Sequence, residues 1–226
     1  GCRGGWVVCS LTAGGAVSFE IVGTIRELDA ACDLCLIDMP LGLPERGERA
    51  VDAAAKRMLG RWHARVFQTP PRCVFDTGDY QAASRSSRHA SGKGLSKQMW
   101  HIMPKIREVD EAVRLDEELR AVIRECHPEI VFWGLSGSVI AESKKTDDGA
   151  RLRAAELAKH AHGVEHAVAD VLGRFPRSVV GRDDVIDAMG CAVAAAGVWD
   201  GTLRTLPDEP ERDSFGLAME MVYRVV

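Results

Sequence analysis

The sequence predicts an α/β domain built in layers. Short apolar runs typical of strands come first, and similar runs then alternate with segments of helical periodicity. The composition is that of a globular protein, with 46% hydrophobic and 27% charged residues. The chain has no internal repeat, no low-complexity tract and no convincing linker. These observations indicate a single domain over residues 1–226.

The first elements are predicted to be strands. Apolar runs at residues 6–11 and 16–22 flank the turn signal Gly14-Gly15, which predicts an antiparallel hairpin. Residues 25–31 favour one or two helical turns. The run from Leu34 to Ile37 is too short for a helix and is typical of a strand buried on both faces.

Helices dominate the rest of the chain. Apolar spacing predicts a helix over residues 46–61 and another over 96–121 with a break near Pro104. Residues 122–135 are expected to be extended. The remaining expected elements are a helix over 150–172, a buried final helix over 181–199, a turn at 207–210 and an edge strand over 217–226.

Charge and cysteine content limit the class of protein. The 29 Lys and Arg residues against 33 Asp and Glu give a net charge of −4, which excludes a strongly basic nucleic-acid coat but leaves a local basic cleft open. Seven scattered cysteines do not indicate a disulfide framework, so we expect a cytoplasmic protein. No apolar run approaches the roughly 20 residues that span a bilayer, so no membrane association is expected.

Asp38 is the first candidate site residue. It directly follows the buried run that ends at Ile37, and open α/β sheets bind ligands at the carboxyl ends of their strands. A charge at the end of an apolar run has to be compensated by a partner. The alternative is an aspartate that only forms the turn before Pro40.

A second candidate is the cluster of Asp183, Asp184 and Asp187 at the start of the final helix. Residues 184 and 187 are neighbours on one helix face, where like charges repel unless a cation lies between them. Helix capping by Asp183 and a favourable dipole interaction of Asp184 are the alternative. Capping does not explain Asp187, which lies one turn further in, so this pattern favours metal binding.

Glu125, His127 and Glu129 form the third candidate. If this segment is a strand, the three side chains project from the same face and form a row of acid, histidine and acid. Pro128 places this row at a strand end or edge. A solvated face with an ordinary histidine is the alternative.

Basic side chains in loops are candidates for phosphate binding, with a solvated surface as the alternative for each. Lys144 and Lys145 are the strongest pair because they lead into a predicted helix N-terminus. The basic residues considered are Arg72, Lys93, Lys97, Lys105, Lys144, Lys145, Arg151 and Arg153.

Several motifs together resemble those of a known family. The chain resembles the predicted nucleases with an RNase H-like fold that are catalogued as domain of unknown function 429. The matching segments, in chain order, are Gly1-Cys2-Arg3-Gly4-Gly5-Trp6, Ile37-Asp38-Met39-Pro40-Leu41-Gly42-Leu43-Pro44, Leu95-Ser96-Lys97-Gln98, Pro104-Lys105-Ile106-Arg107-Glu108-Val109-Asp110, His127-Pro128-Glu129, Lys144-Lys145-Thr146, Asp183-Asp184-Val185-Ile186-Asp187-Ala188 and Gly216-Leu217-Ala218-Met219.

The resemblance implies a three-layer RNase H-like fold: a mixed sheet with antiparallel first strands and parallel later strands, and helices on both faces. Asp38 matches the acid of the fourth strand, and Asp184 and Asp187 match the acids of the last helix. The family's first acid ends a strand that precedes the segment beginning at Gly1. We therefore expect the natural polypeptide to extend upstream by one strand, about 5–10 residues.

The implied activity is hydrolysis of phosphodiester bonds in nucleic acid with two Mg²⁺ or Mn²⁺ ions. The implied metal ligands are Asp38, Asp184, Asp187 and Glu129. His127 is an additional catalytic candidate as a proton shuttle. Lys105, Lys144, Lys145 and Arg72 are the phosphate-binding candidates. Two other functions remain open: a catalytically inactive scaffold that binds a nucleotide or a protein, and a hydrolase of a small phosphorylated substrate. The oligomeric state is left open.

Overall fold

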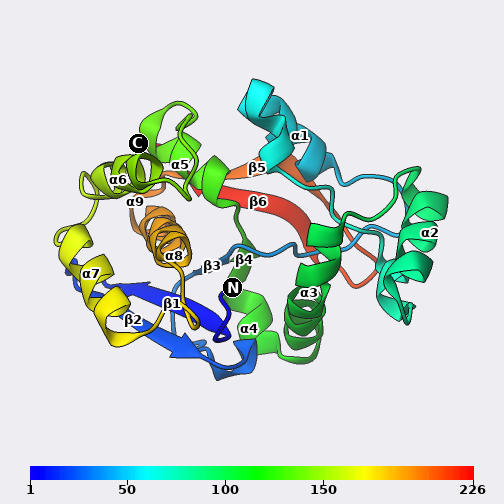
Figure 1. Cartoon of the computed structure of the whole chain (residues 1–226), viewed down its shortest axis with the longest axis horizontal. Coiled ribbons are helices and arrows are strands. Elements are labelled where there is room, and N and C mark those ends of the chain that lie inside the picture. Colours follow the sequence, from blue (N-terminus) through cyan, green and yellow to red (C-terminus); the bar gives the residue numbers. More distant parts are fainter.

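The computed structural model describes residues 1–226 and contains three pairs of strands (Figure 1). β1 (Trp6–Leu11) pairs antiparallel with β2 (Val17–Val22), β3 (Cys35–Ile37) pairs parallel with β4 (Ile123–Glu125), and β5 (Leu203–Arg212) pairs antiparallel with β6 (Ala218–Arg224). The protein is therefore α/β with both antiparallel and parallel strands, as predicted. The three pairs are not joined into one hydrogen-bonded sheet.

Nine α-helices surround the strands. They are α1 (Ala50–Leu59), α2 (Tyr80–Ser91), α3 (Lys97–Leu115), α4 (Glu117–Val122), α5 (Pro128–Ser136), α6 (Asp147–Leu157), α7 (Val164–Arg174), α8 (Arg182–Ala195) and α9 (Gly197–Asp200). Short 3₁₀ turns cover Ile25–Glu27, Gly60–Arg65 and Arg72–Asp76. None of the helices combines the length and the apolar character needed to cross a bilayer.

The local sequence signals predicted most of these elements. The N-terminal hairpin, the short strand before Asp38 and the final helix are confirmed. The expected break at Pro104 is wrong, because α3 continues through this residue to Leu115. The helix expected over 150–172 is two helices, since Gly163 takes a positive φ of 71° between α6 and α7. α2 was not predicted.

The expectation of an extended segment over residues 122–135 is wrong. Only Ile123–Glu125 forms a strand, and α5 begins at Pro128. Proline suits the first turn of a helix, where its missing N–H costs no hydrogen bond. His127 is the N-cap of this helix and Glu129 lies in its first turn. The three side chains at 125, 127 and 129 therefore do not form a row on one strand.

In the C-terminal region the strand expected over 217–226 is confirmed as β6, but the segment before it differs from the expectation. A turn was predicted at residues 207–210, but β5 runs from Leu203 to Arg212. The register against β6 shifts between Leu206 and Glu211. Pro207 and Pro210 lie within this irregularity. Their lack of an N–H is tolerated at a bulge.

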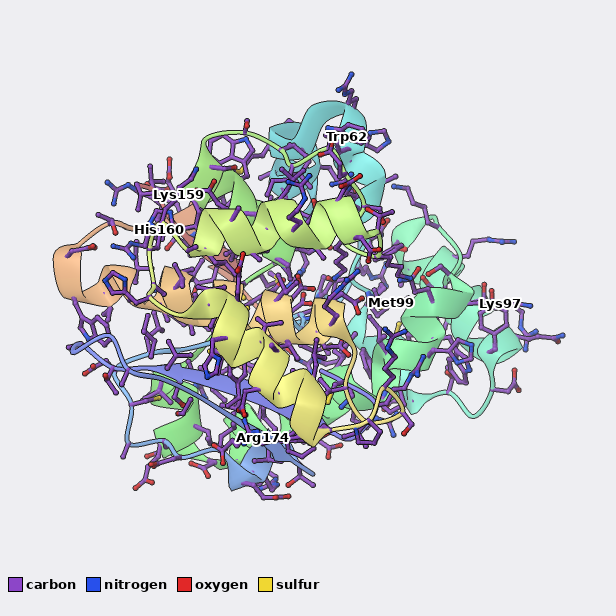
Figure 2. All side chains as sticks on the ribbon, turned by 60° about the vertical axis from the view of Figure 1, so that its left-hand side comes forward. Trp62, Lys97, Met99, Lys159, His160 and Arg174 are labelled. Atoms are coloured by element: carbon purple, nitrogen blue, oxygen red, sulfur yellow. The ribbon has the colours of Figure 1, made fainter.

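α8 is the central helix of the fold. It packs against β1 and β3 on one side and against α5, α6 and α7 on others. Figure 2 shows α6 and α7 in front of α8, with Lys159 and His160 in the turn that joins them and Arg174 at the end of α7. Side chains from β1 and β3 contribute to two large apolar cores, one that includes α8 and another that includes α3.

Candidate functional site

A groove of about 530 Å³ runs along β1, the segment from Ala31 to Asp38 and one face of α8. Four of the charged side chains that line it were singled out by the sequence: Asp38, Lys144, Asp184 and Asp187. They come from three separate parts of the chain, namely the end of β3, the loop before α6 and the first turns of α8. The structure thus brings the three predicted aspartates to one groove.

The position of Asp38 is fixed by the loop that follows it. The Leu41 amide donates to Glu125 Oε2 at 2.7 Å, and the Leu41 carbonyl accepts from Arg49 Nη1 at 2.8 Å. Arg49 Nη1 also donates to Glu125 Oε2 at 2.6 Å, and both side chains are buried. Because burial outweighs the attraction of Arg49, the pKa of Glu125 rises to about 7. This buried pair anchors the backbone at Leu41, in the loop that follows Asp38.

Asp187 is the most deeply buried acid of the groove, with a relative exposure of 6%. Its Oδ2 accepts from the ammonium group of Lys144, whereas its Oδ1 is buried and has no hydrogen-bond partner. Burial raises the pKa of Asp187 to about 7; Lys144 and Arg153 oppose this shift and Asp38 adds to it. A buried carboxylate oxygen without a donor is uncommon and is a candidate ligand position.

Asp184 has a structural role at the start of α8. The helix begins at Arg182 after the N-cap Gly181, and Asp184 Oδ2 accepts from the Gly181 amide at 2.9 Å. The expectation that Asp183 is the N-cap is wrong, because it already lies in the first turn. Burial raises the pKa of Asp184, while the hydrogen bond from Gly181 and the positive charges of the Gly1 amino group and Lys144 lower it.

Lys144 lies among the carboxylates. Burial disfavours its charged form, but the nearby Asp187 and Asp38 outweigh this effect and raise the pKa of the ammonium group. Its positive charge therefore stays in place at neutral pH. The ammonium group is held by an acid of the groove and is not directed outward as a free phosphate contact.

Glu129 and His127 both make contacts within the protein. Glu129 Oε2 accepts from Arg65 at 2.6 Å and Oε1 accepts from Arg153 at 2.8 Å, so both carboxylate oxygens carry an ion pair. His127 Nδ1 accepts from the Glu129 amide at 3.2 Å, which makes this side chain the cap of α5. Burial lowers the pKa of His127 and Lys144 lowers it further, against Asp38 and Glu129. The ring is therefore neutral at pH 7.

The other basic candidates do not join the groove as a group. Lys105 Nζ donates to the Gly5 carbonyl at 2.7 Å. Arg72 is bound in a bidentate manner by Asp110 and also contacts Asp213. Lys145 is exposed and makes no ion pair. Of the four phosphate-binding candidates, only Lys144 lines the groove.

Cysteine thiols contribute to the groove wall. Cys9, Cys35 and Cys191 line it, and Cys126 Sγ lies 3.2 Å from Cys191 Sγ behind it. Burial raises the pKa of Cys9 and of Cys35 to about 12. The thiols of Cys9 and Cys35 are therefore neutral at pH 7 and act as small apolar side chains. The sequence did not identify these cysteines as groove residues, because no local sequence pattern shows that β1, β3 and α8 lie together.

The comparison with known families gives one match. Residues 1–212 match the model of a family described as "Protein of unknown function (DUF429)". The chain belongs to this family. The matched range contains β1, β3 and α8 and thus every acid of the groove. No curated protein and no solved structure matches the chain.

The acids of this DUF429 chain suit a hard divalent cation in their chemistry. Mg²⁺ and Mn²⁺ prefer carboxylate oxygens. Asp187, whose Oδ1 has no hydrogen-bond partner, lines the groove together with Asp38 and Asp184. The chain contains no group of three or more His, Cys, Asp or Glu side chains placed to hold a metal ion as they stand. In the structure, Lys144 contacts one of these acids, Asp187.

Proposed function

We propose that this DUF429 protein is a metal-dependent hydrolase of phosphodiester bonds, with nucleic acid as its substrate, on an RNase H-like arrangement of strands and helices. One observation carries the proposal: Asp38, Asp184 and Asp187 line the same groove, and Asp187 keeps a buried oxygen with no donor. Their order along the chain, one acid after a parallel strand and a pair on the last long helix, supports the RNase H-like arrangement.

The residues have distinct roles in this proposal. Asp38, Asp184 and Asp187 would hold Mg²⁺ or Mn²⁺, which supply a polarised water and neutralise charge on the phosphate when bound. The groove residues contribute binding and positioning. Lys144 is released from Asp187 to contact a phosphate oxygen. Glu129 holds Arg65 and Arg153, and the positive charge of Arg153 acts on Asp187. Neutral His127 fixes the start of α5.

A second function is favoured by a different observation. Lys144 already forms an ion pair with Asp187 in the absence of a metal. The same observation fits a catalytically inactive scaffold that binds a nucleotide or a protein through the groove. The two functions differ in one property, because only the hydrolase requires a divalent cation to be bound by the aspartates.

Two measurements on the purified chain test the proposal. Calorimetric titration with Mn²⁺ is expected to show binding that is lost in Asp187→Asn and weakened at least about tenfold, or about 1.4 kcal/mol, in Asp38→Asn. Labelled single- and double-stranded DNA and RNA oligonucleotides are then incubated with and without Mn²⁺. Cleavage is expected only with the metal and is expected to be absent in both variants.

The matched control is Asp208→Asn, which removes one carboxylate charge from an exposed position on β5. This variant is expected to bind Mn²⁺ and cleave as the unmodified chain does. Metal binding that survives in Asp187→Asn would remove this residue from the ligand set. Absence of any Mn²⁺ binding, together with nucleotide binding in the groove, would favour the scaffold.

A further inference from the structure

Residues 80–107 differ in charge from the rest of the chain. They include six Lys and Arg residues and no Asp or Glu, whereas the other residues include 23 Lys and Arg against 33 Asp and Glu. The segment covers α2 and the first part of α3, and α2 lies at the right-hand end of the molecule in Figure 1. A local excess of positive charge in an acidic chain is typical of a surface that binds a polyanion.

The acids at the two ends of this segment do not form ion pairs with it. Asp79 is the N-cap of α2 and accepts from the Ala82 amide at 2.8 Å. Glu108 accepts from the Trp6 indole at 2.9 Å and from the Ile25 amide at 2.7 Å. Both carboxylates therefore serve the fold, and the positive charges between them are not compensated by these acids.

Half of the basic side chains in the segment have no partner in the protein. Three are exposed and form neither an ion pair nor a hydrogen bond, namely Arg85, Arg88 and Lys97. The other three contact the protein. Lys93 lies 3.8 Å from an acid, and Lys105 and Arg107 donate to backbone carbonyls.

The two free arginines lie on one face of α2. Gln81, Ser84, Arg85 and Arg88 are spaced by three or four residues, which places them in one row on a helix. Together with Tyr80 they line an open hollow of about 210 Å³. The hollow thus offers two guanidinium groups, hydroxyl groups and an amide, and no carboxylate lines it.

The loop that joins α2 to α3 packs against this hollow. The Tyr80 hydroxyl donates to the Leu95 carbonyl at 2.9 Å. Gly94 lies so close that an added Cβ would be 2.9 Å from Ser84 Oγ and 3.1 Å from Arg88 Nη2. The absence of a side chain at this position therefore leaves the Arg88 guanidinium group beside the Ser84 hydroxyl.

Lys97 extends the positive charge from α2 to α3. It lies one turn before Trp100 on α3, and the Trp100 ring meets the Tyr80 ring of the hollow edge to face, with ring centroids 6.1 Å apart. Lys97 is therefore on the side of α3 that faces α2. Figure 2 shows this residue at the outer edge of the molecule, far from α6 and α7.

Helix dipoles do not account for all of these charges. A positive charge is favourable near the C-terminus of α2, which suits Arg88. Arg85 lies in the middle of α2, and Lys97 lies in the first turn of α3, where a positive charge is unfavourable. A bound anion offsets the repulsion among these charges.

The chemistry of the surface favours phosphate groups over an acidic protein or a membrane. All exposed large apolar side chains of the chain, such as Leu115 and Trp199, lie outside residues 80–107. Protein interfaces bury apolar or aromatic side chains at their centre, and membrane-surface helices insert them into the lipid. Guanidinium and hydroxyl groups are the usual contacts of the phosphate oxygens in nucleic acid.

We propose that the α2 face with Gln81, Ser84, Arg85 and Arg88, together with Lys97 of α3, binds the phosphate backbone of a nucleic acid strand. The two arginines hold a phosphate group in the hollow, and Lys97 contacts another phosphate of the same strand. Such contacts carry no sequence information, so binding is independent of base sequence. None of these residues lines the groove of the aspartates, so this surface is separate from the proposed hydrolase site and does not need its metal.

The test measures binding of a fluorescently labelled DNA strand of about 20 nucleotides, longer than a typical single-strand site, and of its duplex. Fluorescence anisotropy is followed in EDTA at a series of KCl concentrations, so the result does not depend on a metal in the groove. Arg85→Gln/Arg88→Gln is expected to weaken binding at least about tenfold at low salt and to reduce the slope of log Kd against log salt by about 1–2. Lys97→Gln is expected to reduce this slope by about 1. The Mn²⁺ affinity of these variants is expected to equal that of the unmodified chain.

The matched control is Arg26→Gln/Arg177→Gln, which removes two arginines that are also exposed and without an ion pair. Its DNA affinity is expected to change by less than about twofold, because charges outside the surface are screened by salt. An equal loss in the control and in Arg85→Gln/Arg88→Gln would overturn the proposal, since it would reflect net charge alone. Absence of binding to both DNA forms at low salt would overturn it as well. Vesicles of phosphatidylserine and phosphatidylcholine are the last arm: binding that needs Arg85 and Arg88, without binding of DNA, assigns the surface to lipid headgroups and overturns the proposal.

Discussion

The ammonium group of Lys144 donates a hydrogen bond to Oδ2 of Asp187, and the other oxygen of this buried carboxylate has no hydrogen-bond donor. The lysine comes from the loop before α6 and the aspartate from the second turn of α8. A lysine thus occupies one side of an acid that is otherwise suited to a divalent cation. Removing Lys144 distinguishes the electrostatic role of this pair from a metal-ligand role of Asp187.

We expect Lys144→Met to bind Mn²⁺ about tenfold more tightly than the unmodified chain, because the competing cation is gone while Asp187 remains. In the absence of metal, the same variant is expected to be less stable by about 1–3 kcal/mol. The reason is that Asp187 loses the one positively charged side chain that contacts it. Calorimetry and urea unfolding measure the two effects.

The control for this variant is Lys145→Met, which removes an exposed lysine one residue away. Both its Mn²⁺ affinity and its stability are expected to stay close to those of the unmodified chain. Weaker Mn²⁺ binding in Lys144→Met than in Lys145→Met would show that Lys144 supports the bound metal and does not compete with it.

The raised pKa of Asp187 predicts how stability depends on pH. Burial lifts the pKa from 3.8 to about 7, so between these values the folded chain binds a proton that the unfolded chain releases. Stability from this group therefore falls as pH rises from about 4 to about 7 and is constant above. This rise in the pKa corresponds to a change of at most roughly 4 kcal/mol in the free energy of unfolding.

Asp187→Asn removes this dependence, so its stability relative to the unmodified chain is expected to increase between pH 4 and pH 7. Urea unfolding at a series of pH values measures the difference. Glu125 also has a pKa of about 7 and acts in the same pH window, but it is present in both proteins and cancels. A difference that is flat between pH 4 and pH 7 would mean that Asp187 is ionised at a normal pKa.

Local sequence signals were sufficient for the parts of the site that depend on one element. Asp38 follows an apolar run that forms β3, and Asp184 and Asp187 are spaced on one helix. Their common position beside one groove was expected only from the family resemblance. Pattern and resemblance together thus placed the three acids near one another.

The partners of these residues could not be predicted, because they come from distant segments. Glu129 is paired with Arg65 and Arg153, and only the packing of α5 against α1 and α6 brings these segments together. Pro128 was interpreted as the edge of a strand, although proline fits the first turn of a helix equally well. The local sequence does not distinguish these two environments.

Glu129→Gln separates a structural role from a ligand role for this residue. Arg153 is 1% exposed, and the loss of its charge partner is expected to destabilise the chain by about 3–5 kcal/mol. The Mn²⁺ affinity of the folded variant is expected to change by less than about twofold, or about 0.4 kcal/mol. Unfolding by urea and calorimetric titration report these two quantities. A large loss of Mn²⁺ affinity with little loss of stability would make Glu129 a ligand.

The start of α8 allows the capping and ligand roles of Asp184 to be separated. Its carboxylate accepts from the Gly181 amide at 2.9 Å, so Asp184→Ala is expected to cost about 0.5–2 kcal/mol, as is typical for a lost cap. Asp184→Asn keeps a side-chain oxygen for this amide but removes the charge. It is expected to retain most of the stability while weakening Mn²⁺ binding. Asp183→Ala, one residue earlier and with no such hydrogen bond, is the control and is expected to cost less than about 0.5 kcal/mol. If the control and Asp184→Ala destabilise the chain equally, the loss reflects charge near the helix dipole and not the hydrogen bond to Gly181.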